Sequence, residues 1–251
     1  MLKHLKISTK IIGTVVAVSL LGLALSSYAS VQMNAIDNAY TGLVDNRDAA
    51  VVKLARAGRN VSDAGYSSYR TLIYDGSSAE AKESAASRED AMAKAVPLLA
   101  DASAAFPEYS TDFGALSDAL TKIEDLGKRA SVYSLANNDE AAKPLLSQMD
   151  GESKKFTGGY QSLRDRMLAL TAAESSELSA QTLSTIQALL AGTVLAMILG
   201  IGGALVVSSK GITGPLKALG LRMEQLAGGK LDVEIAGQDR RDEVGAMAKA
   251  V

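Results

Sequence analysis

Two long apolar runs stand out from the polar background of the chain. The first covers residues 11–29, and the second covers residues 186–207, within a stretch between Glu177 and Lys210 that carries no charge. A helix rises about 1.5 Å per residue, so about 20 residues cross the roughly 30 Å core of a bilayer. Each run therefore predicts a transmembrane helix. The second run also contains glycines that fit either close helix packing or easier bending, namely Gly192, Gly200, Gly202 and Gly203.

Between these runs, apolar residues recur at the three- and four-residue spacing of amphipathic helices. The clearest stripe consists of Leu43, Ala50, Leu54, Ala57, Val61 and Ala64. Ser77 and Glu80 have capping-box spacing, and Asp139 is a suitable N-cap, so both mark helix starts. The region then divides into four helices at about 30–75, 79–105, 110–137 and 140–185. We therefore predict an all-α fold in which they form an up-down antiparallel four-helix bundle.

The charges beside the apolar runs predict the orientation in the membrane. Residues 1–10 carry three lysines and no acidic residue, and two lysines and an arginine follow soon after the second run. The positive-inside rule then places both termini in the cytoplasm and residues 30–185 on the exported side of the membrane, and the absence of cysteine is compatible with a periplasm there. A cleaved signal peptide is the alternative for residues 1–29, although the length of the run favours an uncleaved anchor.

The composition removes several classes of function. The 251 residues contain no cysteine and a single histidine, His4, in the basic N-terminal tip. Disulfides and thiolate metal sites are excluded, and histidine-based chemistry has almost no material. A net charge of −2 gives no electrostatic reason to expect nucleic acid as a partner. Adjacent acids such as Glu89 and Asp90 fit a solvated helix face, so we expect no enzyme, cofactor or metal site in this chain.

Basic and aromatic residues share one level near the predicted membrane-distal end of the bundle. They are Tyr66, Tyr69, Arg70, Arg88, Arg129 and Tyr133. Because arginine forks pair with carboxylates and tyrosines donate hydrogen bonds, this distal cluster is a candidate site for an organic acid or amino acid across a dimer interface. A second, lower cluster contains Arg56, Arg59, Tyr160 and Arg164. The alternative is that the arginines are solvated or paired with neighbouring acids, while the tyrosines are packing residues.

The segment after the second apolar run carries several motifs in a specific order. Ile212-Thr213-Gly214-Pro215 precedes an amphipathic helix with Leu216, Leu219, Met223 and Leu226; a Gly228-Gly229 break, an extended connector at 231–235 and Asp242-Glu243-Val244-Gly245 follow. This order resembles a HAMP domain, the short parallel coiled-coil relay of bacterial membrane receptors. The resemblance assigns Pro215 to the start of the first helix and Asp242, Glu243 and Gly245 to the start of the second.

The whole arrangement resembles the N-terminal half of a methyl-accepting chemotaxis protein. The resemblance implies a homodimeric receptor of the bacterial inner membrane whose second transmembrane helix and HAMP domain pass a signal to an output domain beyond Val251, where the second HAMP helix is also expected to continue. Histidine kinases and diguanylate cyclases share this front end, and a membrane-anchored helical scaffold is a further alternative. The predicted divisions are a cytoplasmic tip at 1–10, membrane helices at 11–29 and 186–207, a sensor at 30–185 and HAMP at 208–251.

Overall fold

The computed structural model of the chain describes residues 4–230 and 232–251, so Lys3 and Leu231 of the predicted motifs lie outside the described residues. Within these ranges every assigned element is helical, which confirms the predicted all-α class. In chain order they are α1 (Ile7–Gly42), the π-helical turn η2 (Leu43–Asp48), α2 (Ala49–Ile73), α3 (Ala79–Ala104), the 3₁₀ turn η3 (Pro107–Tyr109), α4 (Ser110–Leu135), α5 (Asp139–Ser208), the π-helical turn η4 (Ser209–Thr213), α6 (Gly214–Ala227) and α7 (Glu243–Ala250).

Helix contacts divide the chain into two compact units. One unit is Ile36–Ala180, and the other combines the residues up to Ala35 with Gln181–Val251. The predicted membrane boundaries at 29/30 and 185/186 differ from these divisions by a few residues, because they depend on where a bilayer ends rather than on where helices touch. Two continuous helices run through both units: Ile7–Ile73, formed by α1, η2 and α2, and Asp139–Ala227, formed by α5, η4 and α6.

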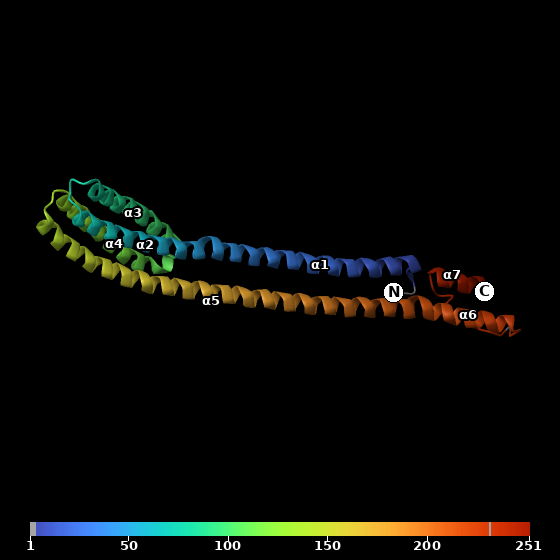
Figure 1. Cartoon of the computed structure of the whole chain (residues 1–251). Coiled ribbons are helices and arrows are strands. Elements are labelled where there is room, and N and C mark those ends of the chain that lie inside the picture. The colour runs from blue at the N-terminus through green and yellow to red at the C-terminus, as the bar shows by residue number, and fades with distance from the viewer. Residues whose placement is uncertain (1–3, 231) are drawn as a thin grey trace. The chain divides into compact units, whose positions relative to one another are not determined.

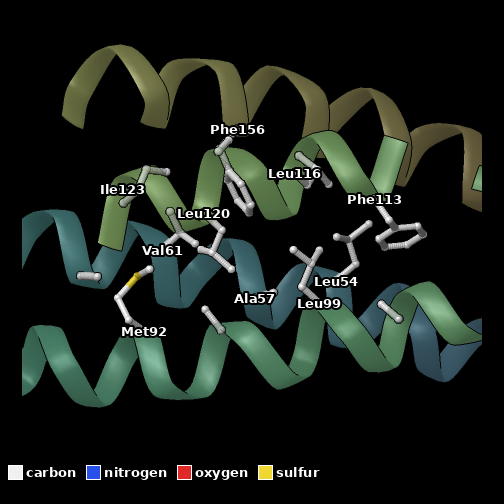
Figure 2. Close-up of a cluster of buried hydrophobic side chains, with 14 of the residues drawn as sticks. Leu54, Ala57, Val61, Met92, Leu99, Phe113, Leu116, Leu120, Ile123 and Phe156 are labelled. Atoms are coloured by element: carbon white, nitrogen blue, oxygen red, sulfur yellow. The ribbon is translucent and has the colours of Figure 1, made fainter. Parts of the chain in front are cut away.

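In the unit Ile36–Ala180, α2, α3, α4 and the first part of α5 form a four-helix bundle (Figure 1). The predicted stripe on the first helix is buried along its whole length, from Leu43 to Ala64. Figure 2 shows labelled side chains from all four helices pointing into one interior, among them Leu54, Leu99, Leu120 and Phe156. Such interlocking of side chains at near-crystalline density supplies most of the stability of a helical bundle.

The helix starts differ slightly from the predicted ones. Ser78, one residue after the predicted cap, accepts a hydrogen bond from the N–H of Ala81 at 3.1 Å and begins α3. Asn138 accepts from the N–H of Ala141 at 3.3 Å, so it caps α5 in place of Asp139. In both places a neighbouring residue of similar capping chemistry takes the role, and sequence alone does not separate such neighbours.

In the other unit, α1 and the second half of α5 lie antiparallel with their apolar surfaces exposed. Each helix is long and apolar enough to cross a membrane, and none of its most apolar stretch is covered by protein. A Cβ added at Gly192 would lie 3.0 Å from Leu25, and one at Gly200 would lie 3.1 Å from Val18. These two glycines therefore serve close packing of the two helices, whereas Gly202 and Gly203 face open space.

Candidate functional site

The start of α7 is built around one buried carboxylate. Asp242 is the N-cap, and its Oδ1 accepts a hydrogen bond from the N–H of Gly245 at 3.1 Å. A Cβ at Gly245 would lie 2.3 Å from the carbonyl oxygen of Arg240, a distance that no side chain tolerates. Glycine is therefore required three residues after the cap, because the connector crosses the first turn of α7 at this point.

Two cations converge on Asp242. Lys10 Nζ lies 2.7 Å from Asp242 Oδ2, and both side chains are completely buried. Arg240 forms a fork with the same carboxylate, with Nε 3.0 Å from Oδ1 and Nη2 2.6 Å from Oδ2. The hydrogen bonds from Arg240, and then those from Lys10 and the Gly245 N–H, hold the pKa of Asp242 far below its usual range although burial opposes this.

A backbone carbonyl joins the same group. Gly211 lies in the π-helical turn η4, and its oxygen accepts hydrogen bonds from Lys10 Nζ at 3.1 Å and from Arg240 Nη2 at 3.0 Å. We call Lys10, Gly211, Arg240 and Asp242 the relay-start cluster. It connects α1, the π-helical turn that continues α5, and the N-cap of α7.

The remaining residues assigned from the motif also lie at helix starts. Pro215 is in the first turn of α6, directly after the π-helical turn η4. The Glu243 carboxylate accepts a hydrogen bond from the N–H of Ile7 at 2.7 Å, so it caps α1 from the beginning of α7. This contact lowers the pKa of Glu243. The acidic pair of the motif thus caps two different helices.

The structure places the residues of the distal cluster in three separate environments. Tyr69 donates from its hydroxyl to Asp150 Oδ2 on α5 at 2.6 Å, and burial followed by this bond raises the pKa of Tyr69 to about 12. The Arg70 guanidinium lies over the Tyr66 and Tyr74 rings, at 5.9 and 5.6 Å from their centroids. These contacts hold the α2 members of the cluster on the surface of the bundle.

The α3 and α4 members lie elsewhere. Arg88 is buried in the core of the bundle, and its Nε has no hydrogen-bond partner among the described residues. Its closest ion-pair contact is Nη2 to Glu89 Oε1 at 3.4 Å, and desolvation lowers the pKa of Arg88. Arg129 pairs with Asp125 on its own helix at 3.2 Å, while Tyr133 is exposed. The six predicted residues therefore lie in three places: the surface of α2, the core at Arg88, and the surface of α4.

In the lower cluster, Tyr160 is the central residue. Its ring stacks on Phe156 and lies 3.0 Å from the place of a Cβ on Gly58, so this glycine makes room for it. Arg164 lies over the same ring at 5.8 Å, and Arg59 faces Asp63 one turn along its own helix at 3.7 Å. These contacts are those of boundary packing and surface pairing.

Comparison with known proteins adds a domain assignment. Residues 207–251 match the HAMP domain family. The chain carries a HAMP domain. A probable chemoreceptor of Sinorhizobium fredii, y4sI, is 32% identical over 151 residues, which cover 55% of this chain and 20% of that protein. No solved structure matches.

These two matches confirm the resemblance to chemotaxis-type transducers. With two helices able to cross a membrane, the chain is a membrane protein that combines a helical bundle with a HAMP domain. It spans about a fifth of the length of the curated relative. The relay-start cluster belongs to this HAMP domain through Gly211, Arg240 and Asp242, whereas Lys10 comes from the other end of the chain.

Sequence reasoning found the acidic pair and the two motif residues Pro215 and Gly245, but it missed Lys10, Gly211 and Arg240 as members of the cluster. In the sequence, Lys10 is recognisable only as one of the N-terminal lysines that predict the orientation in the membrane. Its position directly before the apolar run, where a lysine is expected to face water or headgroups, gave no sign that a partner more than 200 residues away would bury it.

Proposed function

We propose that this protein is a transmembrane receptor of the chemotaxis type, in which the bundle senses a signal and the HAMP domain relays it to a cytoplasmic output region. The observation that carries the proposal is the unbroken helix Asp139–Ala227, which contains part of the bundle core, an apolar segment able to cross a membrane, and the first HAMP helix. A continuous helix gives a displacement at one end a direct route to the other end.

We further propose that both termini are cytoplasmic and that residues 30–185 are periplasmic, as the distribution of lysines favours. The absence of cysteine from the sequence makes this simple to check. A cysteine introduced at exposed Ser62 should react with a membrane-impermeant maleimide in intact cells whose outer membrane is permeabilised. A cysteine at exposed Lys217 should react only after the inner membrane is opened; the reverse pattern would invert the topology.

A homodimer is the proposed assembly. Within one chain, the HAMP helices cover Leu219 and Val244, but Met223 and Met247 are left about half exposed. On α2, exposed Val52, Tyr66 and Ile73 recur at multiples of seven residues on the side away from the bundle core. Because a seven-residue apolar spacing is the pattern of a helix–helix seam, these residues are proposed to meet their counterparts in a second copy.

The ligand proposed for the bundle is a small organic acid or amino acid bound by the distal cluster, with half-buried Arg70 and exposed Arg129 as the cations. Calorimetric titration of the full chain in lipid nanodiscs with such acids tests it. Binding should be lost in Arg70→Ala and Arg129→Ala and kept in Arg59→Ala, whose side chain is exposed in the lower cluster. An acid whose affinity survives both distal substitutions would remove these residues from the site.

The relay itself is tested by joining residues 1–251 to the kinase-control region of a chemoreceptor and measuring kinase activity. Ser184 is exposed on α5 between the bundle and the apolar segment, so Ser184→Pro should interrupt the helix without removing a core contact. We expect Ser184→Pro to change the kinase activity and Ser184→Ala to leave it unchanged. Equal activity in both variants would contradict transmission through α5.

A further inference from the structure

The relay-start cluster touches both membrane helices and not only the one that leads into the HAMP domain. Lys10 lies on α1, Gly211 lies in η4 at the end of α5, and Asp242 begins α7. We propose that α1 is a second input to the HAMP domain, with Lys10 as the positioning residue that sets α7 according to the relative position of α1 and α5. This inference rests on the proposed relay, which it extends.

The first reason is the geometry of Lys10. Its single ammonium group donates to Gly211 O at 3.1 Å and to Asp242 Oδ2 at 2.7 Å. Because hydrogen bonds weaken steeply beyond normal distances, a shift of α1 against α5 by about one ångström breaks the contact with Gly211 or drags Asp242 along. The contacts of the Lys10 ammonium group therefore depend on the position of α1 relative to α5, and not on the position of either helix alone.

The second reason is burial. The side chains of Lys10 and Asp242 are both fully covered, so neither can exchange its partner for water. A buried charge that loses its partner is strongly destabilised, whereas a surface pair is easily replaced by solvent. Lys10 is thus held to α7 far more firmly than an exposed lysine in the same segment, such as Lys210, could be.

The third reason is that α7 depends on the same carboxylate for its cap. Asp242 accepts from Gly245 N–H, and Glu243 accepts from the N–H of Ile7 at the first residue of α1. Two consecutive acids thus connect the beginning of α7 to the beginning of α1. Movement of α1 therefore acts directly on the first turn of α7 through these two carboxylates.

The test measures the amides of α7 by hydrogen exchange and mass spectrometry in the full chain in lipid nanodiscs. In Lys10→Met, exchange across residues 243–250 should accelerate by roughly tenfold or more, because the cap is loosened. The matched control Lys210→Met removes an exposed lysine at the same membrane face and should leave α7 unchanged. Lys10→Arg, which keeps the charge, should restore part of the protection. Unchanged exchange in Lys10→Met would overturn the proposal.

A second measurement separates transmission from simple support. A disulfide between cysteines at Leu25 and Gly192 joins facing positions of α1 and α5. A disulfide between cysteines at Leu25 and Ala196 shifts α1 along α5 by about one helical turn. The shifted disulfide should change exchange in α7 when Lys10 is present and have no such effect in Lys10→Met. An equal effect in both backgrounds would show that α1 does not act through Lys10. Because neither readout uses kinase output, failure of the proposed chemotaxis function leaves these results interpretable.

Discussion

The two ends of the bundle core are made of different chemistry. Near the α3–α4 connection the interior is apolar and contains Leu54, Leu99, Phe106, Phe113 and Leu163. Toward the α2–α3 and α4–α5 connections, buried Leu145, Leu146 and Met149 share the interior with hydroxyl groups and one arginine, namely Ser67, Ser68, Thr71, Ser84, Arg88, Ser131 and Ser134. Helical bundles are stabilised mainly by apolar packing, so the two ends contribute unequally.

Three of the buried hydroxyl groups at this hydroxyl end of the bundle bond within their own helices. Ser68, Thr71 and Ser84 each donate to the carbonyl four residues earlier on their own helix, so these bonds do not join one helix to another. The buried atoms Arg88 Nε, Ser131 Oγ and Ser134 Oγ have no hydrogen-bond partner among the described residues. These buried polar groups therefore add little that holds one helix against another.

The largest expected effect lies at the apolar end. Leu54→Ala removes a fully buried side chain and should lower the free energy of opening of the bundle by about 2–5 kcal/mol. Hydrogen exchange of α2 and α4 amides in the full chain measures it. Val132→Ala, at an exposed position of α4, is the control and should cost well under 1 kcal/mol. A smaller loss for Leu54→Ala than for Val132→Ala would contradict the importance of apolar packing at this end.

Arg88→Met should have the opposite sign. The substitution replaces a buried cation, whose ion-pair contact to an exposed glutamate is 3.4 Å long, with an apolar chain of similar length. Because the arginine pays for desolvation without full compensation, we expect a gain of about 1 kcal/mol in bundle stability, measured by the same exchange experiment. A loss of more than about 1 kcal/mol would show that Arg88 has a stabilising partner.

The apolar and hydroxyl ends of the bundle also differ in how well the sequence predicts them. The buried stripe from Leu43 to Ala64 was predictable because a helix repeats its faces every 3.6 residues, and the caps were predictable to within one residue. The burial of Arg88 was not, because a long cationic side chain on a helix usually reaches water. The capture of Lys10 by Asp242 depends on contact between distant segments, which local periodicity does not encode.

Ser134→Ala tests the hydroxyl end on a smaller scale. Ser134 Oγ is buried and unpartnered among the described residues, so its removal deletes a desolvated polar atom and no bond. We expect a gain of about 0.5–1 kcal/mol in the opening free energy of α4. The matched variant Ser84→Ala removes a hydroxyl that does donate to Glu80 O, so it should give a smaller gain or a slight loss. Equal gains in Ser134→Ala and Ser84→Ala would mean that the missing hydrogen bond of Ser134 does not affect the stability of the bundle.

The smallest expected effect concerns Tyr69, whose hydroxyl joins the two long helices at the surface of the hydroxyl end through Asp150. Because the side chain is partly exposed, Tyr69→Phe should cost only a few tenths of a kcal/mol at neutral pH. The folded-state pKa is raised to about 12, so the protonated donor is favoured by folding. This contribution is complete below the unfolded value of about 10 and disappears as the pH rises toward 12. Spectrophotometric titration at alkaline pH should therefore show one late-ionising tyrosine that is missing in Tyr69→Phe and present in Tyr66→Phe. A titration in which the two variants are indistinguishable would mean that the bond to Asp150 does not persist in solution.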